Sequence, residues 1–311
     1  MSENVKRVLD EMARLMEEAK NDGLTESFNK PIDMTLNALI IKPTNSTIVK
    51  TLQTIKTGTF LDSVFLDKEG KEIGLPLGAN MLLSGLPSSG KSLWIREIIL
   101  RLAESGVKVA FATSEEIFRS DSERYDLETR FIEMTKILGL DWSKIKDNLV
   151  ILDLVKFAEL REFETFIGVY RTLVEHDGVK FLAVDSLSML EDSRGMVKAR
   201  LTDLCRYNQK NNVTSIIVVQ RTTEDADGMN LSGGLSLSHI TDVLGELDYK
   251  RLSSWDGNIK ADTGVAQGQI AYFFRIQKCR LCRAKVNYFA YSITSEGLVR
   301  LIEKDKLDRK A

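Results

Sequence analysis

One stretch of the sequence has the residue types and the spacing of a phosphate-binding loop. It fits the pattern G-x-x-x-x-G-K-[ST] at every fixed position. Its residues are Gly85, Leu86, Pro87, Ser88, Ser89, Gly90, Lys91 and Ser92. The glycines let backbone N–H groups point at phosphate oxygens, Lys91 would neutralise the β and γ phosphates, and the Ser92 hydroxyl would bind Mg²⁺. The stretch predicts a site for ATP and Mg²⁺, and the alternative is a turn that matches by chance.

The segments on either side of this loop fit the same prediction. Residues 81–84 are a short apolar run typical of a buried strand, and residues 91–104 repeat apolar side chains at helical spacing. Strand, loop and helix in this order are the context that the motif requires, because the positive end of the helix dipole then faces the phosphates.

A metal ligand is predicted at the end of another apolar run. Residues 181–184 lead into Asp185, so its carboxylate is expected at the carboxyl edge of a central strand, where ligands of open α/β sheets bind. We expect Asp185 to hold Mg²⁺ together with Ser92, through water. The alternative is a helix cap, which is a common role for an acid at such a position.

Two adjacent carboxylates follow the predicted strand at 108–113. Glu115 and Glu116 are placed to reach the γ-phosphate side of the loop and polarise a water molecule, and Glu115 is the expected base. The alternative is a solvated pair at the start of the next helix, where acids favour the positive dipole end.

Gln220 ends the next apolar run and could report loss of the γ phosphate by hydrogen bonding. The loop at 225–235 carries Asp225 and Asp227, and it has no basic residue past Arg221. Because contacts to nucleic-acid phosphates need Lys or Arg, this loop argues against tight DNA binding.

Strand-like runs alternate with helical segments from residue 56 onward, which is typical of a mainly parallel sheet covered on both faces in an α/β fold. We predict strands at 81–84, 108–113, 149–153, 181–185 and 214–219. We predict helices at 91–104, 125–138, 158–175 and 196–211. Closely spaced runs predict an antiparallel C-terminal extension of the sheet at 242–248, 268–277, 286–293 and 298–302.

The composition is that of a globular chain in a reducing compartment. With 43% apolar and 28% charged residues among 311, the chain has enough apolar material for one large core and a small appendage. No apolar run approaches the ~18 residues of a membrane span, and the charged start lacks a secretory core, so we expect a cytoplasmic protein. A net charge of −2 does not favour DNA or anionic membranes as partners.

Three regions are expected along the chain. Residues 1–55 form a small N-terminal helical appendage, in which 3–21 is an amphipathic helix and the rest is irregular. Residues 56–303 form the nucleotide-binding domain, and 304–311 form a charged tail. The helix either packs on the core of this chain or contacts a protein partner or a neighbouring subunit.

The three cysteines are too few for a disulfide framework. Cys279 and Cys282 form a C-x-x-C pair, but zinc needs four ligands and there is no second pair. On a strand the two side chains would face opposite sides, so we interpret the pair as incidental.

An ordered series of motifs resembles the KaiC-like branch of the RecA-like ATPases, over residues 58–303. After the phosphate-binding loop come the segments 114–116, 181–186, 222–224, 240–244, 278–280 and 291–297. The resemblance implies a RecA-like P-loop core, ATP hydrolysis, and a homo-oligomer, usually a six-membered ring, with ATP held between subunits. In such rings a Lys-x-Arg pair reaches the γ phosphate of the neighbouring subunit, and Lys278 and Arg280 match that pair.

Several departures limit what the resemblance implies. KaiC has two ATPase domains and this chain has one, so a clock function is not implied. Leu281 stands where glycine usually follows the Lys-x-Arg pair, and only Ser238 of the usual Ser–Thr autophosphorylation pair is present. The basic crowding around Lys278 is also compatible with an edge strand that is kept from aggregating by its charge.

We therefore predict a slow Mg²⁺-dependent ATPase that acts as an oligomeric switch. One alternative is an ATP-stabilised ring that does not hydrolyse ATP and recruits partners through its N-terminal helix. Another is a DNA-repair accessory ATPase that binds single strands through Arg194, Lys198, Arg200 and the 275–285 cluster.

Overall fold

The computed structural model describes residues 51–187, 197–221 and 239–302. The chain divides into two compact units between Thr51 and Leu52, and the second unit is the one described below. Outside the described residues lie the predicted N-terminal helix at 3–21, the loop at 225–235, the charged tail at 304–311, Arg194 and Ser238. The expected boundary between residues 55 and 56 stays a prediction.

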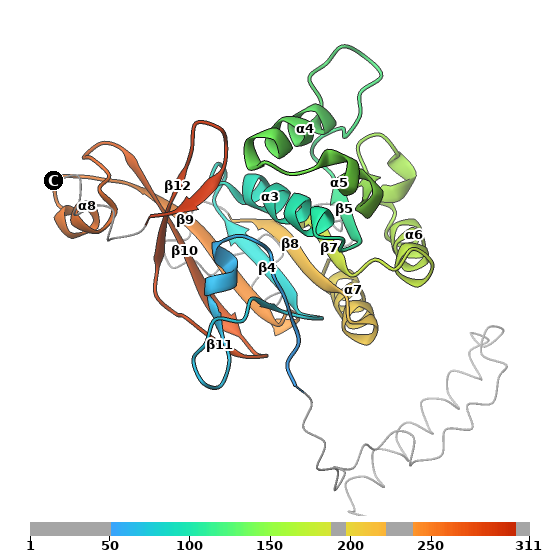
Figure 1. The fold of residues 1–311 in the computed structure, drawn as a ribbon, viewed down its shortest axis with the longest axis horizontal. Coiled ribbons are helices and arrows are strands. Elements are labelled where there is room, and N and C mark those ends of the chain that lie inside the picture. The colour runs from blue at the N-terminus through green and yellow to red at the C-terminus, as the bar shows by residue number, and fades with distance from the viewer. Residues whose placement is uncertain (1–50, 188–196, 222–238, 303–311) are drawn as a thin grey trace, which may run out of the picture. The chain divides into compact units, whose positions relative to one another are not determined.

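A nine-stranded sheet forms the centre of this unit (Figure 1). In spatial order its strands are β13 (Val299–Leu301), β12 (Phe289–Ile293), β10 (Ile270–Cys279), β9 (Val243–Arg251), β4 (Asn80–Gly85), β8 (Thr214–Gln220), β7 (Phe181–Asp185), β5 (Val109–Thr113) and β6 (Leu149–Asp153). The strands from β9 to β6 pair in parallel, whereas β10, β12 and β13 pair antiparallel. The predicted α/β fold with a mainly parallel sheet is confirmed.

One strand of the predicted antiparallel extension is placed differently. The run at 242–248 is β9, which pairs in parallel with β4 and antiparallel only with β10. It therefore joins the parallel core beside the phosphate-binding loop. The spacing of apolar residues does not distinguish the two pairings, because a strand has the same alternation in both.

Helices cover both faces of the sheet (Figure 1). On one face lie α3 (Lys91–Glu104), α4 (Leu127–Leu138) and α5 (Trp142–Asn148), and on the other lie α6 (Phe163–Glu175) and α7 (Val197–Asn211). Buried apolar side chains form two clusters, one on each face of the sheet, and successive strand residues contribute to them in alternation. Leu83 packs in the cluster beneath α3, α4 and α5, and Leu82 packs in the cluster beneath α6 and α7. The parallel strands are buried on both faces, as their continuous apolar runs predict.

The shorter elements differ from the prediction or were not predicted. The helix expected at 158–175 is divided into a 3-10 turn, η2 (Ala158–Arg161), and α6. The seven-residue helix α5 and the two-residue ribbons were missed, because such short segments carry too little periodicity to read. The ribbons pair β1 (Thr54–Ile55) with β3 (Leu75–Pro76) and β2 (Phe65–Leu66) with β11 (Arg283–Ala284).

Aromatic side chains hold α3 against the antiparallel end of the sheet. Phe60, in the 3-10 turn η1 (Phe60–Ser63), stacks on Trp94 of α3 with ring centroids 4.5 Å apart. Trp94 also meets Phe274 of β10 edge to face, at 4.9 Å. These contacts fix the first turn of α3, which follows the phosphate-binding loop directly. None of the helices in the described part of the chain is long and apolar enough to cross a membrane.

Candidate nucleotide site

The phosphate-binding loop joins β4 to α3, as the motif predicts. Gly85 is the last residue of β4, and a side chain there would meet the Leu247 carbonyl oxygen at 2.4 Å, so only glycine fits. Gly90 caps α3 with φ +86°, a conformation that glycine adopts without steric cost. Ser88 also has a positive φ, of 63°. The loop therefore has the tight backbone that directs N–H groups inward.

Lys91 lies inside this loop. Its Nζ donates to the carbonyl oxygens of Gly85 and Leu86 at 2.9 and 2.6 Å, and the residue is only 8% exposed. Burial lowers the pKa of Lys91 to about 8, against the opposing effect of the Asp185 and Glu115 carboxylates. Phosphate oxygens bound nearby would stabilise the charged form of Lys91 further.

Ser92 and Asp185 meet at the carboxyl ends of the parallel strands. The Ser92 hydroxyl donates to Asp185 Oδ1 at 3.2 Å, from the first turn of α3 to the end of β7. Asp185 is 4% exposed, and burial raises its pKa, while Arg96 and the Ser92 hydrogen bond oppose that rise. A hydroxyl and a carboxylate are oxygen ligands of the type that Mg²⁺ prefers. The two residues singled out as metal ligands are thus neighbours.

Glu115 lies beside Asp185 at the carboxyl edge of the parallel strands. Thr113, two residues before it, pairs with Asp185 in the register of β5 and β7. The Glu115 side chain is exposed, and its Oε1 accepts a hydrogen bond from the Ser186 hydroxyl at 2.9 Å. The Ser114 N–H donates to the Asp185 carbonyl oxygen at 3.0 Å, which ties the two strand ends together.

Glu116 has different surroundings from Glu115. Its Oε1 accepts from Arg96 Nη2 at 2.6 Å, and its Oε2 accepts from Arg130 of α4. Two guanidinium groups therefore neutralise this carboxylate and hold it between α3 and α4. The structure thus gives the two adjacent acids separate environments.

Arg96 belongs to the site although the sequence analysis did not single it out. It is 7% exposed, and burial lowers its pKa against the opposing charges of Asp185 and Glu115. One signal could have found it: Arg96 follows Ser92 by four residues on a helix, so both side chains share one face.

Gln220 and Arg221 flank the loop from β8. Gln220 is the register partner of Gly85, and its side chain is exposed. The Arg221 N–H donates to the Gly85 carbonyl oxygen at 3.0 Å. The buried Arg221 side chain forms ion pairs with Glu246 and with Asp248, the latter at 2.8 Å. Arg221 was not predicted as a site residue, yet its charge is one of the influences that lower the pKa of Lys91.

Lys278 and Arg280 lie toward the amino ends of the parallel strands, away from the loop. Lys278 pairs with Leu244, and Leu244 pairs with Leu82, three residues before Gly85 on β4. At about 3.3 Å per residue this places Lys278 about 10 Å from the start of the loop along the strands, toward their amino ends. Lys278 Nζ donates to the Thr241 carbonyl oxygen at 2.6 Å. Partial burial and Arg280 lower the pKa of Lys278, and Asp242 opposes them.

The expectation that Cys279 and Cys282 face opposite sides is wrong. Their sulfur atoms lie 3.6 Å apart. The alternation of a strand does not apply, because β10 ends at Cys279 and the chain turns before β11 begins at Arg283. Within the described ranges, no group of three or more His, Cys, Asp or Glu side chains is placed to hold a metal ion.

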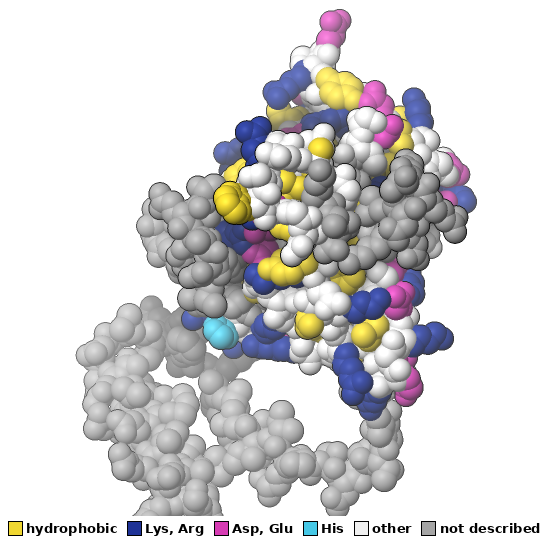
Figure 2. Space-filling view, turned by 90° about the vertical axis from the view of Figure 1, so that its left-hand side faces the viewer, with side chains coloured by type: hydrophobic (Ala, Val, Ile, Leu, Met, Phe, Trp, Pro, Cys, Tyr) yellow, Lys and Arg dark blue, Asp and Glu magenta, His cyan; other side chains and the backbone are white. Residues whose placement is uncertain are grey.

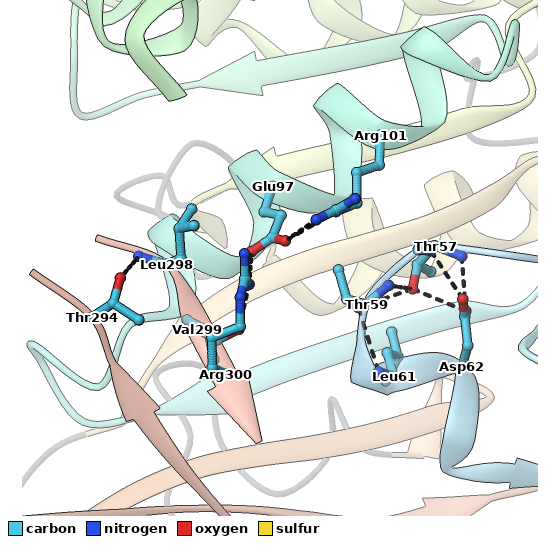
Figure 3. Close-up of polar contacts among 11 residues, drawn as sticks. Thr57, Thr59, Leu61, Asp62, Glu97, Arg101, Thr294, Leu298, Val299 and Arg300 are labelled. Atoms are coloured by element: carbon cyan, nitrogen blue, oxygen red, sulfur yellow. Dashed lines mark hydrogen bonds and ion pairs between the residues drawn. The ribbon is translucent and has the colours of Figure 1, made fainter. Parts of the chain in front are cut away.

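The C-terminal strands β12 and β13 contact the loop and α3, respectively. The Tyr291 hydroxyl of β12 donates to the Ser89 carbonyl oxygen at 2.5 Å. Figure 3 shows Glu97 of α3 between two arginines: its Oε1 accepts from Arg101 at 2.9 Å and its Oε2 from Arg300 of β13 at 2.7 Å. Glu97 is 1% exposed, so these ion pairs compensate a buried charge and fasten α3 to β13.

The residues of the loop fit a bound nucleoside triphosphate and its metal. Of the described side chains, the Ser89 hydroxyl is one that is buried without a hydrogen-bond partner. Lys91 is bonded to carbonyl oxygens of its own loop, and Ser92 and Asp185 present oxygen atoms together. A polar hydroxyl, a buried ammonium and paired oxygen ligands are the chemistry that a Mg²⁺-bound triphosphate requires.

Comparison with known proteins agrees with this geometry. A family model described as the KaiC ATPase matches residues 55–306. The chain therefore belongs to the KaiC family of ATPases, and the resemblance inferred from its motifs is confirmed, as is the RecA-like P-loop core. Membership supports ATP binding and ATPase activity as the general function of this domain.

The fold is also similar to that of a solved structure. This is a KaiC-like protein from the hyperthermophilic archaeon Pyrococcus horikoshii OT3, with a TM-score of 0.60 and 18% sequence identity. The similarity covers 81% of this chain and 100% of that one, and at this identity it bears on the fold. A search of curated proteins found no match.

Proposed function

We propose that this chain hydrolyses ATP slowly in the presence of Mg²⁺ and acts as an oligomeric switch. The observation that carries this proposal is the grouping of Lys91, Ser92, Asp185 and Glu115 at one edge of the sheet, with Ser92 bonded to Asp185. Binding groups, metal ligands and a carboxylate are therefore close together, as phosphoryl transfer to water requires.

Binding is assigned to the loop and to α3. Backbone N–H groups of the loop and the Lys91 ammonium would hold the phosphates, and Ser92 and Asp185 would hold Mg²⁺, Asp185 through water. The metal ion, when bound, supplies positive charge against the phosphate oxygens. Lys91 would exchange the carbonyl oxygens of Gly85 and Leu86 for phosphate oxygens, which compensate its charge better.

The catalytic base is assigned to Glu115. Its carboxylate would orient a water molecule and take its proton, while the Ser186 hydroxyl holds Oε1 in place. Glu116, which the sequence also suggested, is paired with Arg96 and Arg130 and is better suited to fixing α4 beside the site. Gln220, which pairs with Gly85 at the start of the loop, is proposed to sense the γ phosphate.

We place the nucleotide between adjacent copies of the chain, in a ring that is six-membered by resemblance. Lys278 and Arg280 would act on the γ phosphate of the neighbouring copy, because within their own chain they lie toward the amino ends of the strands, away from Lys91. Positive charge supplied across an interface stabilises the transition state and couples hydrolysis to subunit contacts.

The experiment measures phosphate release and particle mass in solution with ATP, with ADP and without nucleotide. We expect turnover that stops when Mg²⁺ is chelated, and a larger particle when ATP is bound. The Lys91→Ala variant should lose both effects. Assembly with ATP in the absence of any phosphate release would instead favour the non-hydrolysing scaffold, and a particle mass unchanged by ATP would overturn the switch.

DNA binding is the weaker alternative. Figure 2 shows Lys and Arg side chains on one face of the molecule, dispersed among apolar side chains. Part of the positive charge of the 275–285 cluster is already neutralised within the chain, since Arg275 pairs with Glu246 and Lys285 pairs with Glu72. Binding of labelled single-stranded DNA at two salt concentrations tests this, because a true phosphate interface weakens steeply with salt.

A further inference from the structure

Cys279 and Cys282 close a short turn that is anchored at both ends. Cys279 is the last residue of β10, and Cys282 directly precedes β11, whose Ala284 pairs with Phe65 of β2. Inside the turn, the Arg280 N–H donates to the Asp242 carbonyl oxygen at 3.0 Å. The two sulfur atoms lie 3.6 Å apart, which is van der Waals contact. The sheet therefore holds two thiols at a distance that small side-chain rotations can close.

The surroundings of the two sulfurs differ. The Cys282 thiol donates to the Cys279 sulfur, and so do the N–H groups of Leu281 and Cys282, which together lower the pKa of Cys279. Donation to Cys279 and burial raise the pKa of Cys282. Cys279 thus has the character of an attacking thiolate, and Cys282 is the second thiol beside it.

The third cysteine provides a contrast within the same chain. Cys205 lies on α7, is 2% exposed, and packs in the apolar cluster between α6, α7 and the sheet. Burial raises the pKa of Cys205 to about 12. It is therefore expected to be inert under conditions in which an accessible thiolate reacts. Cys279 and Cys282 are only partly buried.

We propose that Cys279 and Cys282 form a reversible dithiol–disulfide site that exchanges with low-molecular-weight disulfides of the glutathione type. The Cys279 thiolate attacks one sulfur of the small disulfide, which releases one small thiolate and leaves a mixed disulfide on Cys279. Cys282, as it loses its proton, then attacks the Cys279 sulfur and releases the second small thiolate. The chain loses two electrons and two protons, and the small disulfide gains them.

The position of the turn gives the disulfide a consequence. A bond between the two sulfurs encloses Arg280 and Leu281 in a small ring, next to Lys278. Arg280 is exposed and is one of the two residues proposed to reach a neighbouring copy. Oxidation would restrict the backbone on which Arg280 is carried and so change ATP turnover. This consequence rests on the proposed function, whereas formation of the disulfide does not.

The first test follows the bond itself in the full-length chain. The protein is equilibrated with increasing proportions of oxidised to reduced glutathione, free thiols are alkylated, and the chain is cut with trypsin. Because Arg280 lies between the cysteines, the expected product is Cys279-Arg280 joined by a disulfide to Leu281-Cys282-Arg283, and dithiothreitol should reverse it. Cys205 should stay a free thiol, and at neutral pH Cys279 in the folded chain should react with iodoacetamide at least about tenfold faster than Cys205.

Single variants separate the two steps. Cys282→Ser should stop at the mixed disulfide on Cys279, and Cys205→Ser is the matched control, in which the Cys279–Cys282 bond should form as in the wild type. Two results overturn the proposal. In one, both thiols stay alkylatable in excess oxidised glutathione. In the other, glutathione stays attached to Cys279 in the wild-type chain, without transfer to Cys282.

The second test compares ATP turnover of the oxidised and reduced protein. We expect a change of at least about twofold that dithiothreitol reverses, and no change in the Cys279→Ser/Cys282→Ser double variant. If the oxidised protein turned over ATP at an unaltered rate, the proposed effect of the disulfide on ATP turnover through Arg280 would be wrong. Absence of turnover in the reduced protein would contradict the proposed function instead, since the peptide assay reports the disulfide independently.

Discussion

The ammonium groups of Lys91 and Lys278 lie toward opposite ends of the parallel strands. Lys91 follows the carboxyl end of β4, whereas Lys278 pairs with Leu244, which is level with Leu82 of β4. The Lys278 Nζ donates to the Thr241 carbonyl oxygen, toward the amino ends of the strands. Both lysines are expected to meet the phosphates of ATP. Because one chain holds Lys278 about 10 Å from the start of the loop along its strands and directs its ammonium away from the loop, we expect the two lysines to serve one nucleotide only when two chains contribute.

The separation of these lysines predicts complementation between two inactive variants. Lys278→Ala should lower turnover at least about 100-fold and spare ATP binding, because it removes a positive charge that acts on the transition state. Lys91→Ala should lose binding. When the two variants are mixed, some interfaces combine an intact loop with an intact Lys278, so turnover should return above that of either variant.

A neighbouring basic residue provides the control for this experiment. Arg283→Ala lies in the same basic run, on β11, and should keep the turnover of the wild type. No recovery on mixing, together with equal loss of binding and turnover in Lys278→Ala, would show that Lys278 acts within its own chain.

The contrast between Glu115 and Glu116 predicts two different phenotypes. Glu115→Gln should lower turnover by about 100-fold or more with ATP binding retained, because a general base is removed. Glu116→Gln should keep measurable turnover but lose about 2 kcal/mol of stability, because the charge-assisted hydrogen bonds to Arg96 and Arg130 are weakened. Phosphate release and thermal unfolding measure the two effects. If Glu116→Gln lost turnover and Glu115→Gln lost only stability, Glu116 would be the base and Glu115 the structural residue.

The buried ammonium of Lys91 predicts a pH dependence of ATP binding. With a pKa lowered to about 8, the free site keeps its positive charge below that pH and loses it above. Bound phosphates favour the charged form, so binding above pH 8 takes up a proton, and affinity falls by up to about tenfold per pH unit. Calorimetry in buffers of different ionisation enthalpy measures this uptake.

A charge-retaining variant is the control for the pH experiment. Lys91→Arg carries a guanidinium that stays protonated in this range, so its affinity, although lower, should not fall between pH 8 and 9. A wild-type affinity that is flat over the same interval would contradict the low pKa.

The Glu97 ion pairs predict a stability difference within one helix (Figure 3). Glu97→Gln removes a buried charge from between Arg101 and Arg300 and should lower the free energy of unfolding by about 2 kcal/mol. Glu104→Gln, at the end of the same helix, disturbs only a longer pair with Lys144 at 3.7 Å and should change stability by less than about 0.5 kcal/mol. Urea unfolding compares the two, and equal losses would contradict the role given to Glu97.

The sequence by itself determined the elements whose cause is local. The loop 85–92 is recognisable because phosphate binding needs glycines, a lysine and a serine at set intervals along one strand–turn–helix unit. The core strands β4 to β8 and the helices α3, α4 and α7 were predicted within two residues, because continuous apolar runs and helical spacing are properties of neighbouring residues. Asp185 could be placed beside Ser92 because parallel strands end at the same sheet edge.

Tertiary structure alone decided which distant segments meet. It placed β9 beside β4, directed Lys278 toward the amino ends of the strands, paired Glu116 with Arg96 and Arg130, and brought the sulfurs of Cys279 and Cys282 together. Each outcome depends on strand order, on register or on where a strand ends and turns. These are set by contacts between residues far apart in the chain, and the alternation of side chains along a strand is the same whichever partner it takes.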